Sequence, residues 1–206
     1  MNNKERYGEL YTPLFLINEM LDVLPKYVFK DKTLRWLDPG CGKGGFISEV
    51  GNRLEEGLKE EIVDDEERKG HVLKEMLYMV DINKEHEEYI KPYKNGKIAN
   101  YLDEELYDYK FDIIIGNPPF NFGGIKKVPT NKIKKKQHDG KTIWIEFIKK
   151  SVSLLKENGL LLFLVPSIWM KEDRAKMYDF MTGFKLHKIR CFSNTVWQMM
   201  SIGSVK

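Results

Sequence analysis

Apolar runs of strand length alternate along the chain with longer stretches of helical period. The short runs predict six strands, at residues 34–38, 77–80, 97–99, 111–115, 160–165 and 184–192. Apolar residues spaced three or four apart predict helices between them, at residues 46–59, 64–76, 143–158 and 167–181. Repeated strand–helix units indicate an α/β fold with a doubly wound, mostly parallel sheet. We expect its last strand pair to be incomplete, because Lys206 follows the sixth strand closely.

Polar residues and glycines indicate where some of these helices begin and end. Asp64, followed three residues later by Glu67, loosely fits a capping box at a helix start. Thr142 is placed to cap the helix that Gly159 closes, and Gly183 is placed to stop the last predicted helix.

Length and composition indicate a single globular domain. The 206 residues are 42% hydrophobic and 32% charged, which is ordinary for a chain that buries a full core. We therefore take residues 1–206 as one domain, with an N-terminal helical segment at 1–33 and a helical insertion at 51–76.

Several classes of protein do not fit the sequence. No apolar run reaches the roughly 18 residues of a membrane span, and the N-terminus leads into no signal core. The two cysteines, Cys41 and Cys191, favour neither a disulfide framework nor a zinc site. We expect no membrane partner and a reducing compartment, which is the cytoplasm or, for a viral chain, an intracellular host compartment.

Three polar residues end or follow predicted strands. Asp38, Asp81 and Asn117 each come directly after an apolar run. Because ligands of doubly wound sheets bind beyond the carboxyl ends of the strands, we expect these three side chains at one site.

Glycines follow the first of these residues. Gly40, Gly42 and Gly45 satisfy the G-x-G-x-x-G pattern, but Asp81 lies about twice as far along as the roughly 20 residues that a dinucleotide site favours. A phosphate loop would need Ser or Thr after Lys43. A carboxylate before the glycines repels a pyrophosphate and attracts ammonium and sulfonium groups, as in S-adenosylmethionine.

Asp81, at the end of the second strand, is placed to accept hydrogen bonds from both hydroxyls of a ribose. The alternative is a turn residue at a strand end.

The tetrapeptide Asn117-Pro118-Pro119-Phe120 follows the fourth predicted strand. The Asn117 side-chain oxygen and the Pro118 carbonyl can both accept hydrogen bonds from one NH2 group, while Phe120 offers a face for stacking. Proline fixes its φ angle, which aims that carbonyl in advance. The alternative is an Asn-Pro turn that only leaves a strand.

Lysines crowd the segment after this tetrapeptide, although the net charge is only +3. They are Lys126, Lys127, Lys132, Lys134, Lys135, Lys136 and Lys141. Such a cluster could contact DNA phosphates beside the site, or it could be a solvated surface loop.

Taken in order, these residues resemble the amino-group (N6-adenine) DNA methyltransferases with the gamma-like motif order, as in Eco57I-type and type I restriction–modification methyltransferase domains. The segments that carry the resemblance are residues 7–13 (motif X), 38–46 (motif I), 78–81 (motif II), 111–120 (motif IV), 144–147 (motif V) and 160–167 (motif VI). One departure is Gly45, where relatives often carry Asn.

The resemblance implies methyl transfer from S-adenosylmethionine to the N6 amino group of adenine in double-stranded DNA, within a restriction–modification or viral DNA-modification system and without a metal. It implies a catalytic group of Asn117, Pro118, Pro119 and Phe120. It implies cofactor contacts from Tyr11, Thr12, Pro13, Asp38, Gly40, Gly42, Phe46, Asp81, Ile82 and Asp103. The implied DNA contacts are Lys126, Lys127, Lys134, Lys135 and Lys136.

In this motif order a target-recognition domain normally follows the catalytic domain, and none is evident in the sequence. A separate recognition subunit is one explanation. Three alternatives stay open at this point: a protein-glutamine methyltransferase, an RNA N-methyltransferase, and an inactive module that binds S-adenosylmethionine or DNA.

Overall fold

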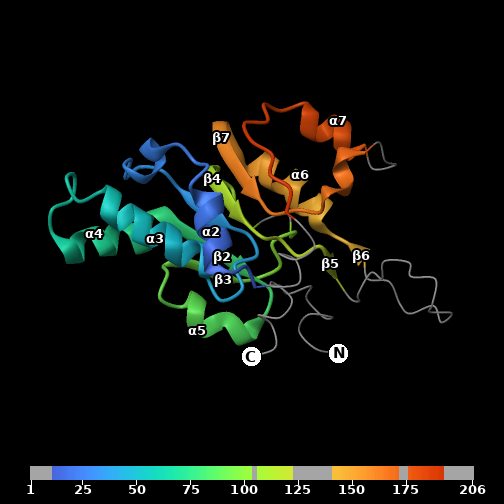
Figure 1. Ribbon diagram of the computed structural model, residues 1–206. Helices are drawn as coiled ribbons and strands as arrows, with labels where there is room; N and C mark the ends of the chain where they lie inside the picture. Colours follow the sequence, from blue (N-terminus) through green and yellow to red (C-terminus); the bar gives the residue numbers. More distant parts are fainter. Residues whose placement is uncertain (1–10, 104–105, 123–140, 172–175, 193–206) are drawn as a thin grey trace.

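A parallel sheet forms the centre of the protein. The computed structural model describes residues 11–103, 106–122, 141–171 and 176–192. Within these residues the main sheet has five strands in the order β3-β2-β1-β4-β7, and every neighbouring pair is parallel (Figure 1). The strands are β1 (Trp36–Asp38), β2 (Leu77–Asp81), β3 (Asn95–Ile98), β4 (Phe111–Gly116) and β7 (Leu155–Phe163). The strand order reverses between β1 and β4, which confirms the predicted doubly wound α/β sheet.

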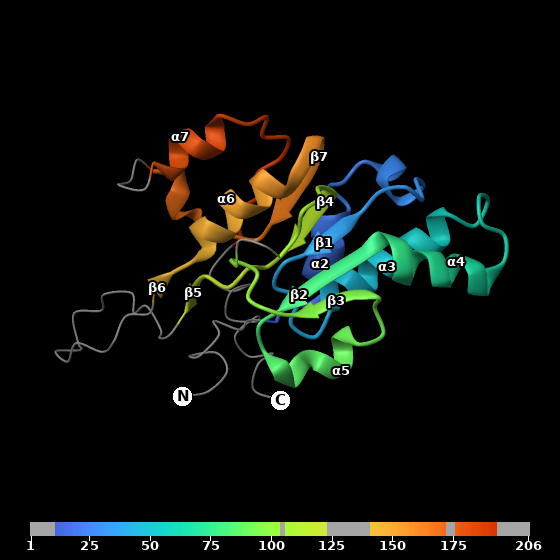
Figure 2. The ribbon, with the colours of Figure 1, turned by 180° about the vertical axis from the view of Figure 1, so that it is seen from behind.

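Helices and turns connect these strands. The α-helices are α2 (Leu14–Leu21), α3 (Gly45–Gly57), α4 (Asp65–His71), α5 (Glu87–Ile90), α6 (Trp144–Leu154) and α7 (Met177–Thr182). Shorter turns are η1 (Lys26–Phe29), the π-helical η2 (Val72–Met76), η3 (Lys84–His86) and η4 (Ser167–Met170). A small antiparallel pair joins β5 (Asn121–Phe122) to β6 (Lys141–Thr142). In Figures 1 and 2, α6 lies beside β7 and α7 lies on the outer side of α6, whereas α3 and α4 lie on the opposite side of the molecule.

Successive strand positions bury their side chains on opposite faces of the sheet. Trp36 and Leu77 belong to a core cluster that includes side chains of α2 and α3. Their neighbours Leu37 and Tyr78 belong to a second cluster, which includes Phe147 of α6. A strand that is covered on both faces needs apolar residues at consecutive positions. This requirement explains why the sequence shows continuous apolar runs.

The prediction of a sixth strand at residues 184–192 is wrong. The structure shows no strand there, and Phe184, Leu186 and Ile189 are about half exposed. A strand forms only against a hydrogen-bonding partner, and β7 has β4 as its one partner among the described residues. The apolar residues of this segment are therefore insufficient to make it a strand.

The predicted helix at residues 167–181 is also wrong as a single element. The structure has the 3-10 turn η4 at its start and the short α7 at its end. Lys176, just before α7, has a left-handed backbone with φ of 51°. An αR helix cannot run through such a residue, which separates α7 from what precedes it. Gly183 follows Thr182 as the C-cap of α7, as predicted.

The helix predicted after Thr142 is shorter than expected at both ends. Ile143 occupies the N-cap position and makes no side-chain capping bond, while Thr142 pairs with Asn121 in the small β5–β6 sheet. The helix ends at Leu154 rather than near Gly159, because the next residue already pairs with β4. A β carbon on Gly159 would lie 3.0 Å from the Asp112 carbonyl oxygen, so this glycine permits a close approach of backbones.

The predicted helix start at Asp64 agrees with the structure. The Asp64 carboxylate accepts a hydrogen bond of 2.8 Å from the Glu67 backbone N–H at the start of α4. The predicted helical insertion at residues 51–76 comprises the end of α3, then α4 and η2. None of the helices within the described ranges is long and apolar enough to cross a membrane.

Candidate active site

A pocket of about 360 Å³ lies beyond the carboxyl ends of β1, β2 and β4. Several of the predicted site residues line it, namely Tyr11, Thr12, Asp38, Gly40, Gly42, Phe46, Asp81, Ile82, Asn117 and Pro119. The structure therefore brings together residues that lie more than 100 positions apart in the sequence, such as Thr12 and Asn117. The volume of this pocket falls within the range of roughly 300–1,000 Å³ that is usual for small-molecule sites.

The glycine loop between β1 and α3 forms one wall of this pocket. Gly42 and Gly44 have φ angles of +54° and +78°, which glycine adopts readily. The Cys41 N–H donates to the Val80 carbonyl at 3.0 Å, which fastens the loop to the end of β2. A β carbon on Gly40 would lie 3.3 Å from Pro119 Cδ, so the loop also approaches the segment after β4 closely.

Asp38 is buried at the end of β1, with 1% of its surface exposed. Its Oδ1 accepts a hydrogen bond of 3.1 Å from the Gly40 N–H. Burial raises the pKa of Asp38 to about 8, and the negative charge of Asp81 adds to this shift. A ligand with a positive charge in the pocket would favour the ionised form of this carboxyl group.

Gly116 lies against Asp38 from the end of β4. Its φ is +146°, and a β carbon there would be 2.7 Å from Asp38 Oδ1. Only glycine fits this position without a shift of the carboxyl group. The ends of β1 and β4 therefore meet at the Asp38 side chain.

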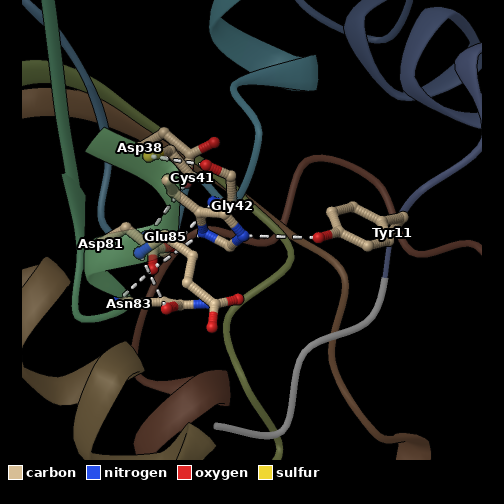
Figure 3. A network of polar contacts seen from close by, with 9 residues as sticks. Tyr11, Asp38, Cys41, Gly42, Asp81, Asn83 and Glu85 are labelled. Atoms are coloured by element: carbon tan, nitrogen blue, oxygen red, sulfur yellow. Dashed lines mark hydrogen bonds and ion pairs between the residues drawn. The ribbon is translucent and has the colours of Figure 1, made fainter. Parts of the chain in front are cut away.

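Asp81 is held at the end of β2 by backbone donors. Its Oδ2 accepts a hydrogen bond of 2.8 Å from the Gly42 N–H, and its Oδ1 accepts one of 2.8 Å from the Asn83 N–H (Figure 3). A carboxylate has about four lone-pair positions, so two acceptor positions are left for further donors. Its side chain is 12% exposed at the pocket wall.

His86 also lines the pocket, and the sequence patterns did not single it out. Its Nδ1 lies 3.2 Å from Asp81 Oδ1, and its Nε2 lies 3.4 Å from the Tyr11 hydroxyl. The sequence gives one signal for such a role, since His86 follows the strand-end Asp81 by five positions. The spacing of the four histidines in the sequence does not suit a metal site.

Asn117 reaches the N-terminal segment across the pocket. Its Nδ2 donates a hydrogen bond of 3.1 Å to Thr12 Oγ1, from a residue 105 positions away. This bond links the predicted catalytic amide to the predicted cofactor segment.

The other predicted residues of the catalytic group lie differently. Pro118 is not among the lining residues, although its Cα would be 3.8 Å from a β carbon on Gly40. Phe120 packs beside the core cluster of Trp144 and Trp169. The aromatic side chain from this region that lines the pocket is Phe122, which is 42% exposed.

Two predicted cofactor residues do not line the pocket. Pro13 is the N-cap residue of α2. Asp103 is exposed and accepts a hydrogen bond of 2.8 Å from Asn100 Nδ2. At this point of the wall the lining residues are Asn100, Tyr101 and Leu102. The resemblance implied Asp103, but the chain turns away from the pocket before it.

Most of the lysine cluster lies outside the described residues, including Lys126, Lys127, Lys134, Lys135 and Lys136. Lys141 is described and lines the pocket, with its Nζ 3.6 Å from a Glu146 carboxylate oxygen. In the part of the chain that the structure describes, no group of three or more His, Cys, Asp or Glu side chains is placed to hold a metal ion.

The fold matches solved structures of methyltransferases. A modification subunit of a putative type I restriction enzyme from Vibrio vulnificus aligns with a TM-score of 0.58 and 20% identity, over 84% of this chain and 38% of that one. A putative class I S-adenosylmethionine-dependent methyltransferase from Listeria monocytogenes aligns with a TM-score of 0.52 and 20% identity, over 84% of this chain and 51% of that one. The chain therefore has the Rossmann-like fold of the class I methyltransferases.

Sequence comparisons agree with this fold. An uncharacterized adenine-specific methylase from Mycoplasma pneumoniae is 25% identical over 79% of this chain and 56% of its own length. The type II methyltransferase M.TthHB8I from Thermus thermophilus is 28% identical over 81% of this chain and 36% of its own length. The chain thus spans about half, or less, of the length of these relatives.

A family profile covers most of the chain. The profile described as Eco57I restriction-modification methylase matches residues 29–197, which include the strand ends that carry Asp38, Asp81 and Asn117. The chain therefore belongs to the Eco57I restriction-modification methylase family, and its cofactor is S-adenosylmethionine.

Proposed function

We propose that this chain is the catalytic part of a DNA methyltransferase that methylates the N6 amino group of adenine. One observation carries the proposal: Asn117, Asp38 and Asp81 line the same pocket, from the ends of three neighbouring strands. An acceptor for an amine therefore lies beside carboxyl groups suited to a cationic nucleoside. The name of the Mycoplasma relative, an adenine-specific methylase, supports adenine as the target base.

The residues of the pocket fit S-adenosylmethionine chemically. When bound, this cofactor supplies a methyl group that its sulfonium has already activated. Asp38 offers a buried carboxyl group to the cationic methionine portion, and Asp81 offers acceptor positions to the ribose hydroxyls. Gly40 and Gly42 let the backbone approach where a side chain would collide. We infer that Tyr11 and Thr12 border the same ligand, since both line the pocket.

Asn117 and Pro118 are proposed to bind the amino group that is methylated. The lone pair of an adenine amino nitrogen is delocalised into the ring, which makes it a poor nucleophile. Two acceptors favour a tetrahedral nitrogen and stabilise the positive charge that develops on it. Because Asn117 Nδ2 donates to Thr12, its Oδ1 is the end of the amide that accepts from the substrate. The proton is lost to water after the transfer.

An adenine within a duplex cannot reach this pocket unless it leaves the base stack, which costs a few kcal/mol. We propose that Phe120 or Phe122 stacks on the extruded base, and that the lysine cluster contacts phosphates beside it. We further propose that a separate subunit reads the target sequence, as the chain matches a type I modification subunit.

A substrate panel tests the proposed activity. The full-length chain would be incubated with methyl-labelled S-adenosylmethionine and, separately, duplex DNA, RNA and a release-factor protein. We expect label in duplex DNA only, and nucleoside analysis should identify the product as N6-methyladenine. Label in RNA alone or in protein alone would show that the substrate is not DNA. Binding of S-adenosylmethionine without transfer to any of the three would favour an inactive binding module or a chain that transfers methyl only with the proposed recognition subunit.

A further inference from the structure

His86 is a buried imidazole placed between two predicted cofactor residues. Only 3% of its surface is exposed, at the end of η3. Its Nδ1 lies 3.2 Å from Asp81 Oδ1, and its Nε2 lies 3.4 Å from the hydroxyl of Tyr11, which is 75 positions away. We propose that His86 is a positioning residue for the cofactor, which orients the Asp81 carboxylate toward the ribose through Nδ1.

The hydrogen bonds that Asp81 already accepts show why its contact with His86 matters. Gly42 N–H donates to Oδ2, and Asn83 N–H donates to Oδ1. Each oxygen therefore has one backbone donor. The imidazole places Nδ1 3.2 Å from Oδ1, the oxygen that Asn83 already holds. Rotation of the carboxylate about its own axis would break both hydrogen bonds and move Oδ1 away from Nδ1, so Oδ2 keeps an acceptor position directed at the pocket.

Tyr11 fixes the other side of the imidazole. Figure 3 shows the Tyr11 ring reaching the network from the side opposite Asp81 and Asn83. The Lys43 ammonium lies 5.3 Å from the centre of the Tyr11 ring and 5.6 Å from that of Tyr89, within the range of cation–π attraction. These contacts hold Tyr11 in place against the glycine loop, and His86 is thereby held between two anchored groups.

The protonation that this role requires follows from the two neighbours. A carboxylate oxygen only accepts, so the proposed role requires the hydrogen on Nδ1, toward Asp81. Nε2 of a neutral imidazole then accepts from the Tyr11 hydroxyl. In this proposal His86 acts on cofactor binding through Asp81 and is not assigned a part in the methyl transfer.

The inference rests on the proposed role of Asp81 in binding the ribose of S-adenosylmethionine. Two substitutions of His86 distinguish the contribution of Nδ1 from that of Nε2. The amide nitrogen of Asn can occupy the place of Nδ1, and that of Gln can occupy the place of Nε2. We expect His86→Gln to weaken S-adenosylmethionine binding by about tenfold and His86→Asn to recover most of that loss. Calorimetric titration of the full-length chain measures both, and exposed His187→Gln is the matched control.

A double-substitution cycle separates positioning from a general packing role. In an Asp81→Asn background the loss caused by His86→Gln should disappear, because the residue that it orients is gone. An equal loss in both backgrounds, equal losses for the Asn and Gln variants, or wild-type affinity in His86→Gln would each overturn the inference. If Asp81→Asn alone binds S-adenosylmethionine as tightly as the wild type, the ribose assignment itself fails instead.

Discussion

The two halves of the pocket are held in place in different ways. At the ends of β1 and β2, Asp38 accepts from Gly40 N–H and Asp81 accepts from Asn83 N–H, each only two residues further along. At the end of β4, Asn117 is bound to Thr12, 105 residues away. At the ends of β1 and β2, the half proposed to bind the cofactor, each carboxylate is thus held by a short local turn, to which the Gly42 N–H adds a second bond at Asp81. The half proposed to bind the amine depends on a long-range contact.

This difference predicts which functions can be separated by substitution. Residues of the cofactor half should affect binding of S-adenosylmethionine, because their carboxylates are proposed to contact that ligand. Asn117 should affect the transfer itself, because its amide acts on the substrate nitrogen. The following predictions test that separation, beginning with the largest expected effect.

Asn117→Ala removes the side-chain acceptor and should lower the methylation rate by about a thousandfold or more. Affinity for S-adenosylmethionine should stay near the wild-type value, because the backbone donors to Asp38 and Asp81 are unchanged. Single-turnover transfer of labelled methyl to duplex DNA measures the rate, and calorimetry measures binding. Equal activity in the variant would refute the assigned role of Asn117.

Asp81→Asn should have the opposite profile. The substituted amide loses the charge and one acceptor at the end of β2, which should weaken binding of S-adenosylmethionine about 10- to 100-fold. At saturating cofactor the transfer rate should recover most of its wild-type value. Asp108→Asn, an exposed acid away from the pocket lining, is the matched control. A rate defect that persists at saturation would mean that the two halves are not separable.

The sequence predicted the placement of Asp38 and Asp81 better than that of Asp103 and Phe120, because a short turn depends mainly on adjacent residues. An aspartate that ends an apolar run and precedes glycines can form its turn from adjacent residues, and the structure shows such turns at Asp38 and Asp81. The positions of Asp103 and Phe120 depend on how the chain packs around them. Asp103 lies outside the pocket, and Phe120 packs beside a core cluster.

Contacts between distant segments explain the remaining errors. His86 carries no distinctive sequence pattern, and its place becomes evident only when Tyr11 lies beside it. The segment 184–192 has the composition of a strand but no strand partner within the described residues. Turns that adjacent residues form can be predicted from a single sequence, whereas contacts between distant segments depend on the whole folded chain.

Gly116→Ala tests the point where the two halves touch. The new β carbon would lie 2.7 Å from Asp38 Oδ1, at a φ of +146° that side chains rarely adopt. We expect a loss of about 2–3 kcal/mol in the free energy of unfolding. Gly70→Ala in α4 is the matched control, because its nearest neighbour would be the Lys74 ammonium at 4.0 Å. That control should be neutral or stabilising by up to about 1 kcal/mol. Urea unfolding measures both, and equal effects would show that Gly116 has no special place.

The smallest predicted effect is a pH dependence that comes from Asp38. Burial raises the pKa of this carboxyl group to about 8 in the folded protein, from an ordinary value near 4 in the unfolded chain. Between these two values the folded state binds one proton more than the unfolded state, so this contribution to stability falls as pH rises.

Asp38→Asn should remove this contribution, since the amide does not titrate. The unfolding free energy of the wild type, taken relative to Asp38→Asn, should therefore fall by up to about 1.4 kcal/mol between pH 6 and pH 7. Saturating S-adenosylmethionine should reduce this slope, because a cation beside Asp38 favours the ionised carboxylate. Parallel stability curves for the two proteins would show that Asp38 is already ionised in the folded state. A slope that the cofactor leaves unchanged would place the cationic part of the ligand away from Asp38, and the cofactor half would then need a different arrangement.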